Sequence, residues 1–177
     1  MKPNATKSRQ LTQTTLPYAE SALEPVLSQK NIDYHYAHLY RGYVDRYNNH
    51  EGDREFNRAG AFLHDIFFTQ FCDPRTNNTK PGPLFRDLIR PFQRLSVLKS
   101  EMSDAAMQIQ GSGWVYLSVE GRVRTIPNHQ VRSDIALLID WWEHAWNPDY
   151  LWRKQDYFDK IWDCINWDHI DDRLALL

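Results

Sequence analysis

A turn-rich segment at residues 73–83 divides the 177-residue chain into two parts with different patterns of apolar residues. The segment is dense in proline, asparagine and glycine, which favour turns and interrupt helices and strands. It therefore predicts a boundary between an N-terminal helical hairpin domain at residues 16–73 and a C-terminal α/β domain at residues 84–177.

The N-terminal part carries two helical patterns. Over residues 31–47, apolar and aromatic side chains recur every three or four residues, as on one face of an amphipathic helix. A similar pattern covers residues 54–71, after a polar connector at residues 48–53. We expect the two helices to pair as an antiparallel hairpin.

The C-terminal part mixes helical and strand patterns. Apolar periodicity predicts helices at residues 84–89, 95–110 and 156–176. Short runs rich in β-branched and aromatic residues predict strands at residues 114–119, 123–126 and 135–140. Helices followed by strands packed with helices indicate an α+β fold. We expect the hairpin to be followed by a small antiparallel three-stranded sheet surrounded by helices.

The composition limits the partners and the location. The formal charge of -2 gives no long-range attraction for nucleic acid. No stretch approaches the roughly 18 to 20 apolar residues of a membrane span. Residues 1–15 are polar and lack an apolar segment, so we expect a flexible tail and a cytoplasmic protein. Cys72 and Cys164 lack metal-binding spacing and are expected to be reduced thiols.

Asp140 and His144 lie four residues apart in an aromatic cluster that follows an apolar run. A carboxylate and an imidazole at this spacing form a plausible half of a metal site. His35 and His64 stand on the two predicted helices and are candidates for the other half. Three imidazoles and a carboxylate suit iron or manganese. Each residue alone also fits a structural role, as a core histidine or a capping carboxylate.

Several segments resemble the iron/manganese superoxide dismutases. In that family the first ligand stands in Tyr-His-Tyr on a long helix, as His35 does between Tyr34 and Tyr36. Residues 64–70 are similar to the segment that begins with the second ligand. Residues 140–144 match the C-terminal signature Asp-x-Trp-Glu-His. Shorter similarities extend the resemblance over most of the chain, at residues 16–18, 111–114 and 166–167.

The resemblance implies an enzyme that converts superoxide to dioxygen and hydrogen peroxide. It implies one iron or manganese ion per subunit, held by the following four residues: His35, His64, Asp140 and His144. It also implies a catalytic role for Tyr43, eight residues after the first ligand. His129 aligns with a glutamine that contacts solvent at the metal in manganese-type members, and the adjacent Gln130 is an alternative.

The resemblance further implies a homodimer. Glu143 is expected to reach His144 of a second subunit. Trp114, Trp142 and Tyr150 are expected around the ligands or at the dimer interface. Three aromatic residues flank Glu143, which also favours a partner over solvent.

Several positions depart from the family pattern, and two of them bear most on activity. Leu39 replaces a histidine that helps to close the substrate channel and pairs with a tyrosine of the neighbouring subunit, for which Tyr150 is the matching position. Gly60 stands where iron-type members carry a glutamine. An inactive structural protein on the same fold and a zinc hydrolase using the same four side chains therefore stay as alternatives, and the choice between iron and manganese stays open.

Overall fold

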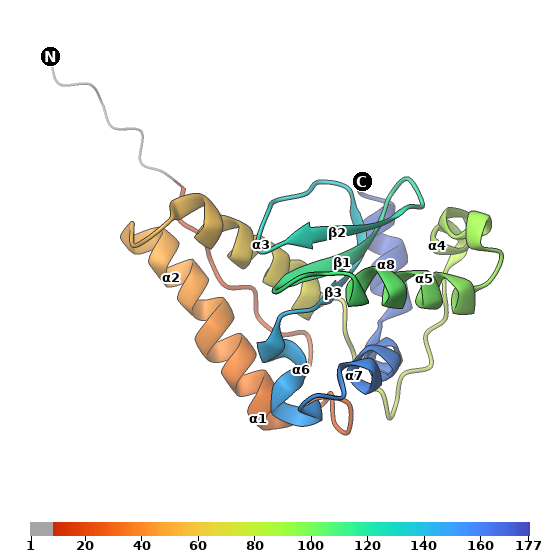
Figure 1. Ribbon diagram of the computed structural model, residues 1–177, viewed down its shortest axis with the longest axis horizontal. Coiled ribbons are helices and arrows are strands. Elements are labelled where there is room, and N and C mark those ends of the chain that lie inside the picture. Colours follow the sequence, from red (N-terminus) through yellow and green to blue (C-terminus); the bar gives the residue numbers. More distant parts are fainter. Residues whose placement is uncertain (1–8) are drawn as a thin grey trace, which may run out of the picture.

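The computed structural model describes residues 9–177, and the part of the expected tail at residues 1–8 lies outside this range. Helices come first along the chain, and a three-stranded antiparallel sheet with helices around it follows (Figure 1). The predicted α+β class is therefore confirmed.

The N-terminal hairpin begins with one continuous helical segment. It consists of α1 (Gln29–Ile32), a π-helical stretch (Asp33–Tyr40) and α2 (Arg41–Asn49). The hydroxyl of Ser28 accepts a hydrogen bond from the first turn, and the left-handed backbone of His50 ends the helix. α3 (Arg54–Thr69) then runs back beside α2 (Figure 1). The predicted hairpin is confirmed, and the π-helical stretch is an addition that regular helical periodicity did not predict.

Residues 11–14 lie along this first helix. The Leu11 N–H donates to Asn48 Oδ1 over 2.9 Å, and the Gln13 side chain donates to the Tyr36 carbonyl over 2.7 Å. The Tyr36 hydroxyl donates to the Thr14 carbonyl over 2.9 Å. These bonds tie residues 11–14 to the hairpin, and the extent of the expected flexible tail at residues 1–15 stays a prediction.

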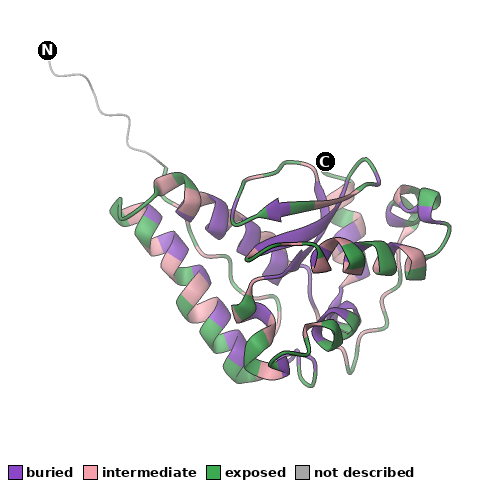
Figure 2. Cartoon of the chain, viewed as in Figure 1, coloured by how far each residue is buried: buried purple, intermediate pink, exposed green. Residues whose placement is uncertain are grey.

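The sheet has β1 (Gly113–Ser118) at its centre, with β2 (Val123–Pro127) on one side and β3 (Ile135–Asp140) on the other. Every residue of β1 and β3 is buried, as Figure 2 shows. α5 (Leu95–Met107) packs against β1 and β2, and α3 packs against β3. The sequences of β1 and β3 are nearly continuous apolar runs because other parts of the chain cover both faces of these strands.

The C-terminal region differs from the prediction. The single helix expected at residues 156–176 is divided into α7 (Lys154–Ile161), a 3₁₀ turn (Trp162–Cys164) and α8 (Trp167–Leu174). Ile165 is extended and forms an antiparallel bridge with Phe71, so the helix cannot continue through it. α6 (Glu143–Tyr150) was not predicted, whereas the helix expected near residue 84 is α4 (Pro83–Leu88), with a 3₁₀ turn (Arg90–Phe92) after it.

The two parts of the chain share one apolar core. Phe67 of α3 lies against Trp114 of β1, with ring centroids 6.0 Å apart. Gln70 bonds both backbone groups of Leu138, which joins the end of α3 to β3. Among residues 9–177, no helix has the length and apolar character needed to cross a bilayer.

Candidate metal centre

Four buried or nearly buried side chains meet between the two parts of the chain. They come from four different elements and are His35, His64, Asp140 and His144. Their candidate ligand atoms all lie within 4.8 Å of one another. The side chain of His144 is 14% exposed, whereas the other three are completely or almost completely buried. The structure therefore brings together all four residues that were predicted as ligands.

The three imidazoles point at one carboxylate oxygen. The Nε2 atoms of His35, His144 and His64 lie 3.3, 3.5 and 3.8 Å from Asp140 Oδ2. None of these four atoms has a hydrogen-bond partner among the described residues. Burying polar atoms without partners is costly. A cation among them would satisfy all four, and three nitrogens with one oxygen suit iron or manganese.

Neighbouring groups orient two of the candidate ligands. His64 Nδ1 lies 2.7 Å from the Gly60 carbonyl, which can only accept, so the proton sits on Nδ1 and the Nε2 lone pair faces the centre. Asp140 Oδ1 accepts from the Trp142 N–H over 2.8 Å, which leaves Oδ2 for a metal. The Tyr157 hydroxyl donates to the Asp140 carbonyl over 3.0 Å, a support that the sequence analysis missed.

The electrostatics favour the protonation states that a metal requires. Burial, together with the neighbouring His144, lowers the pKa of His35 to about 4. Burial and the neighbouring His35 also lower the pKa of His64. Burial alone would raise the pKa of Asp140, but its interactions with His144 and His35 outweigh burial and hold that pKa below its usual range. At neutral pH, His35 and His64 are therefore neutral and Asp140 is ionised, as metal ligands must be.

A chain of three aromatic side chains runs beside His64. Trp114 Nε1 donates to His129 Nδ1 over 3.1 Å, and His129 Nε2 lies 2.9 Å from the Tyr43 hydroxyl. An indole can only donate, so neutral His129 carries its proton on Nε2 and donates it to the Tyr43 oxygen. Burial lowers the pKa of His129 to about 4 and raises the pKa of Tyr43 to about 12. The Tyr43 proton is thus free to bond another group.

Comparison with known proteins gives two matches to family models. The alpha-hairpin domain of the iron/manganese superoxide dismutases matches residues 10–56, and the C-terminal domain of the same family matches residues 80–173. The chain belongs to this family. It is 36% identical to an iron superoxide dismutase of Bacteroides fragilis, with 90% of this chain and 96% of that protein covered.

Other relatives differ in their metal. The mitochondrial manganese superoxide dismutase of Schizosaccharomyces pombe is 32% identical, with 90% of this chain and 85% of that protein covered. A superoxide dismutase of Porphyromonas gingivalis named for both metals is 30% identical, with 90% and 96% covered. The similarity to iron/manganese superoxide dismutases therefore includes members of both metal types.

The remaining predicted residues of this superoxide dismutase family member occupy different settings. Trp142 stacks on His129, with ring centroids 4.5 Å apart. Gln130 is exposed and bonds Arg132, so His129 rather than Gln130 faces the centre. Tyr150 is buried, and its hydroxyl donates to the Val26 carbonyl over 2.6 Å. That hydroxyl therefore donates within the chain, and the expected place of Tyr150 near the dimer interface stays a prediction.

Gly60 has a role that the sequence analysis did not identify. A Cβ atom at this position would lie 2.8 Å from two carbons of the Tyr43 ring. The missing side chain therefore makes room for Tyr43, while the donor to Tyr43 comes from His129 in the other part of the chain. A signal for this was present in the sequence, because Gly60 stands where iron-type members have a larger residue.

Proposed function

We propose that this chain is a superoxide dismutase that holds one iron or manganese ion per subunit and works as a cytoplasmic homodimer. The four ligand atoms that converge without partners in a buried centre, in a member of this family, carry the proposal. We propose that each domain supplies half of the site: residues 16–73 contribute His35 and His64, and residues 84–177 contribute Asp140 and His144.

The centre fits a redox metal and a small anionic substrate. Bound iron or manganese supplies a one-electron couple, which allows one superoxide to be oxidised to dioxygen and a second to be reduced to hydrogen peroxide with two protons. Asp140 contributes the only ionised ligand and keeps the positive charge of the site low. The neutral imidazoles let that site accept either oxidation state.

Tyr43 is the group best placed to bond the substrate. Its oxygen accepts from His129, so its own proton is directed to another acceptor. His129 in turn is held by Trp114 and covered by the Trp142 ring. We propose that Tyr43 donates a hydrogen bond in the site and that His129 keeps it in position. Trp142 and Phe56 pack against His129 and help to hold this pair in place.

The exposure of His144 and Glu143 supports the homodimer. Glu143 begins α6 and is exposed in the single chain, although it adjoins a ligand. His144 is the ligand whose side chain remains partly exposed, and its Nε2 atom faces the metal centre, which leaves Nδ1 for a second subunit. We propose that Glu143 of one subunit bonds His144 of the other, which fixes the orientation of the imidazole.

The cytoplasmic location has one structural support. Cys72 and Cys164 are free thiols, as is usual in a reducing compartment. A tagged chain expressed in its own host should be recovered in the cytoplasmic fraction. Recovery from the medium or from an envelope fraction would contradict this part of the proposal.

Elemental analysis with a dismutase assay tests the main proposal. The wild type, produced with both metals available, should contain about one iron or manganese ion per chain. His64→Ala should empty the centre and reduce activity beyond the roughly 10–100-fold loss typical of changes around a metal site. His38→Ala is the matched control, because His38 is an exposed histidine on the first helical segment.

The outcomes separate the alternatives. A wild type with neither iron nor manganese, or equal metal content in His64→Ala, would contradict the site. Full occupancy by iron or manganese without dismutase activity would instead favour the structural protein on the same fold. Preferential occupancy by zinc with hydrolytic activity would favour the zinc hydrolase.

A further inference from the structure

Two cysteines that the proposed reaction does not use are joined by a backbone hydrogen bond where the two parts of the chain meet. Phe71 and Ile165 form an isolated antiparallel bridge. Next to this bridge, the Cys72 N–H donates to the Cys164 carbonyl over 2.8 Å. Cys72 and Cys164 are therefore directly opposite each other across the pair of segments, although 91 residues separate them in the sequence.

The backbone pairing sets the relation between the two side chains. Cys164 ends the 3₁₀ turn, and its carbonyl accepts the single backbone hydrogen bond that joins it to Cys72. The Cα atoms of hydrogen-bonded residues in a regular antiparallel pair lie about 5.5 Å apart, within the range of roughly 4.4–6.8 Å found in disulfides. Phe71 and Ile165 of the bridge are themselves buried in the core. Both sulfur atoms are free.

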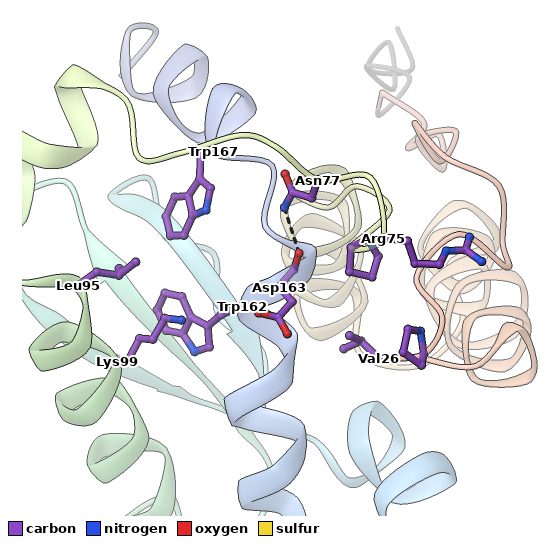
Figure 3. Close-up of a pocket in the computed structure, with 10 residues that line it drawn as sticks. Val26, Arg75, Asn77, Leu95, Lys99, Trp162, Asp163 and Trp167 are labelled. Carbon is purple, nitrogen blue, oxygen red and sulfur yellow. Dashed lines mark hydrogen bonds between the residues drawn. The ribbon is translucent and has the colours of Figure 1, made fainter.

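Hydrogen bonds hold the chain around the Phe71–Ile165 bridge in place, and a cleft beside the bridge brings solvent near it. The Asn77 side chain donates to the Asp163 carbonyl over 3.0 Å (Figure 3). It also donates to the Ile165 carbonyl over 2.9 Å, so the turn-rich segment at residues 73–83 is held beside the bridge. An open cleft of about 430 Å³ lies beside them, and Pro74 and Asp163 are among its lining residues. Cys72 is partly exposed and Cys164 is buried, so Cys72 is the thiol that a solute reaches first.

We propose that Cys72 and Cys164 form a reversible disulfide when hydrogen peroxide accumulates. The source of the peroxide rests on the proposed function, since peroxide is the product of superoxide dismutation. The Cys72 sulfur attacks one peroxide oxygen, the O–O bond breaks, and a sulfenic acid and water result. The Cys164 sulfur then displaces the hydroxyl group as a second water. Two thiols and one hydrogen peroxide thus give one disulfide and two waters.

The reaction should be slow. Burial raises the pKa of both thiols, so neither is appreciably ionised at neutral pH, and the thiolate is the reactive form. The disulfide therefore responds to sustained peroxide. Once formed, the disulfide closes a loop of about 90 residues between Cys72, after α3, and Cys164, before α8. This closure should raise the Tm by roughly 5–10 °C.

Peptide mapping of the metal-loaded wild type tests the proposal. One sample is incubated with reagent hydrogen peroxide, and a second is exposed to superoxide generated enzymatically. Both are denatured, alkylated, digested without reductant and analysed by mass spectrometry, and their dismutase activity is measured separately. We expect a peptide crosslinked between Cys72 and Cys164 in both samples, its loss after treatment with dithiothreitol, and a raised Tm before that treatment.

Cys72→Ser is the matched control, because the change is small and the site is partly exposed. It should show neither the crosslink nor the rise in Tm, and it should keep its basal activity. Sulfinic acid at Cys72 with an alkylated Cys164, or a disulfide only between chains, would overturn the proposal. A crosslink with reagent peroxide but not under superoxide, in active enzyme, would overturn the link to turnover. An inactive wild type that still forms the crosslink with reagent peroxide would refute the dismutase function and leave the cysteine pair intact.

Discussion

At the scale of single residues, Gly60 decides where Tyr43 lies. The Tyr43 ring occupies the space in which a side chain at position 60 would stand. His64 bonds the backbone carbonyl of Gly60, a contact that any residue at this position could provide. Position 60 therefore acts on the ligand through its backbone and on Tyr43 through the absence of a side chain.

Gly60→Ala should lower activity more than metal content. The added methyl group would push the Tyr43 ring away and weaken its bond to His129, whereas the bond from His64 would remain. Alanine is favoured over glycine in a helix by about 1 kcal/mol, but overpacking typically costs about 1–3 kcal/mol, so the net effect should be a loss of stability. Dismutase assays, elemental analysis and thermal unfolding would measure the three quantities.

Gly42→Ala serves as the control for this prediction, because the atoms nearest to its added methyl belong to the Arg46 guanidinium and not to Tyr43. It should be neutral or slightly stabilising. Unchanged activity in Gly60→Ala at full occupancy would mean that the position of Tyr43 does not matter for turnover.

At the scale of elements, α8 begins where a contact between distant residues interrupts the helix that local periodicity predicted. The chain is extended at Ile165, where it pairs with Phe71, and Asn166 then begins a new helix. The Asn166 side chain accepts from the His169 N–H over 3.2 Å. Asp171 of the same helix accepts from the Phe85 N–H over 2.8 Å and so caps α4 as well.

Asn166→Ala should destabilise the protein without impairing the metal centre. Loss of the cap should cost about 1 kcal/mol, which corresponds to a fall in Tm of roughly 2–4 °C for a chain of this size. Asn166→Asp retains an oxygen acceptor and should keep most of the stability. Thermal unfolding of both variants would check this, and equal Tm values for the two would show that the cap contributes nothing.

At the scale of the whole molecule, the proposed homodimer would let a second copy of the chain complete the site. Glu143 is exposed at the start of α6, next to a ligand that is itself partly exposed. A carboxylate that covers this ligand from another subunit would tie metal retention to assembly. The proposed dimer and the proposed metal centre should therefore weaken together.

Glu143→Ala should raise the dimer dissociation constant by about tenfold or more, as expected when one partner of a buried charged contact is removed. It should also increase the rate of metal loss to a chelator. Sedimentation equilibrium and chelator kinetics would measure both effects, with Glu101→Ala, an exposed glutamate of α5, as the control. A wild type that is monomeric at micromolar concentration would contradict the dimer.

The sequence alone determined the elements whose signals are local, and it named the four residues of the candidate metal centre. The periodicities at residues 31–47 and 54–71 predicted the hairpin, because a helix buries one face at a regular spacing. Short runs rich in β-branched and aromatic residues predicted the strands, because such side chains pack well on a sheet. The motifs around His35 and His64 and the signature at residues 140–144 named all four residues that the structure brings together.

The tertiary structure decided what depends on contacts between distant residues. The helix expected through Ile165 is interrupted because Phe71 pairs with it, and no local pattern near residue 165 contains that information. The order of donation from Trp114 to His129 to Tyr43 likewise joins the two parts of the chain. The sequence specifies the chemical group of each side chain. The protonation and the partners of that group depend on burial and on neighbours, which only the fold supplies.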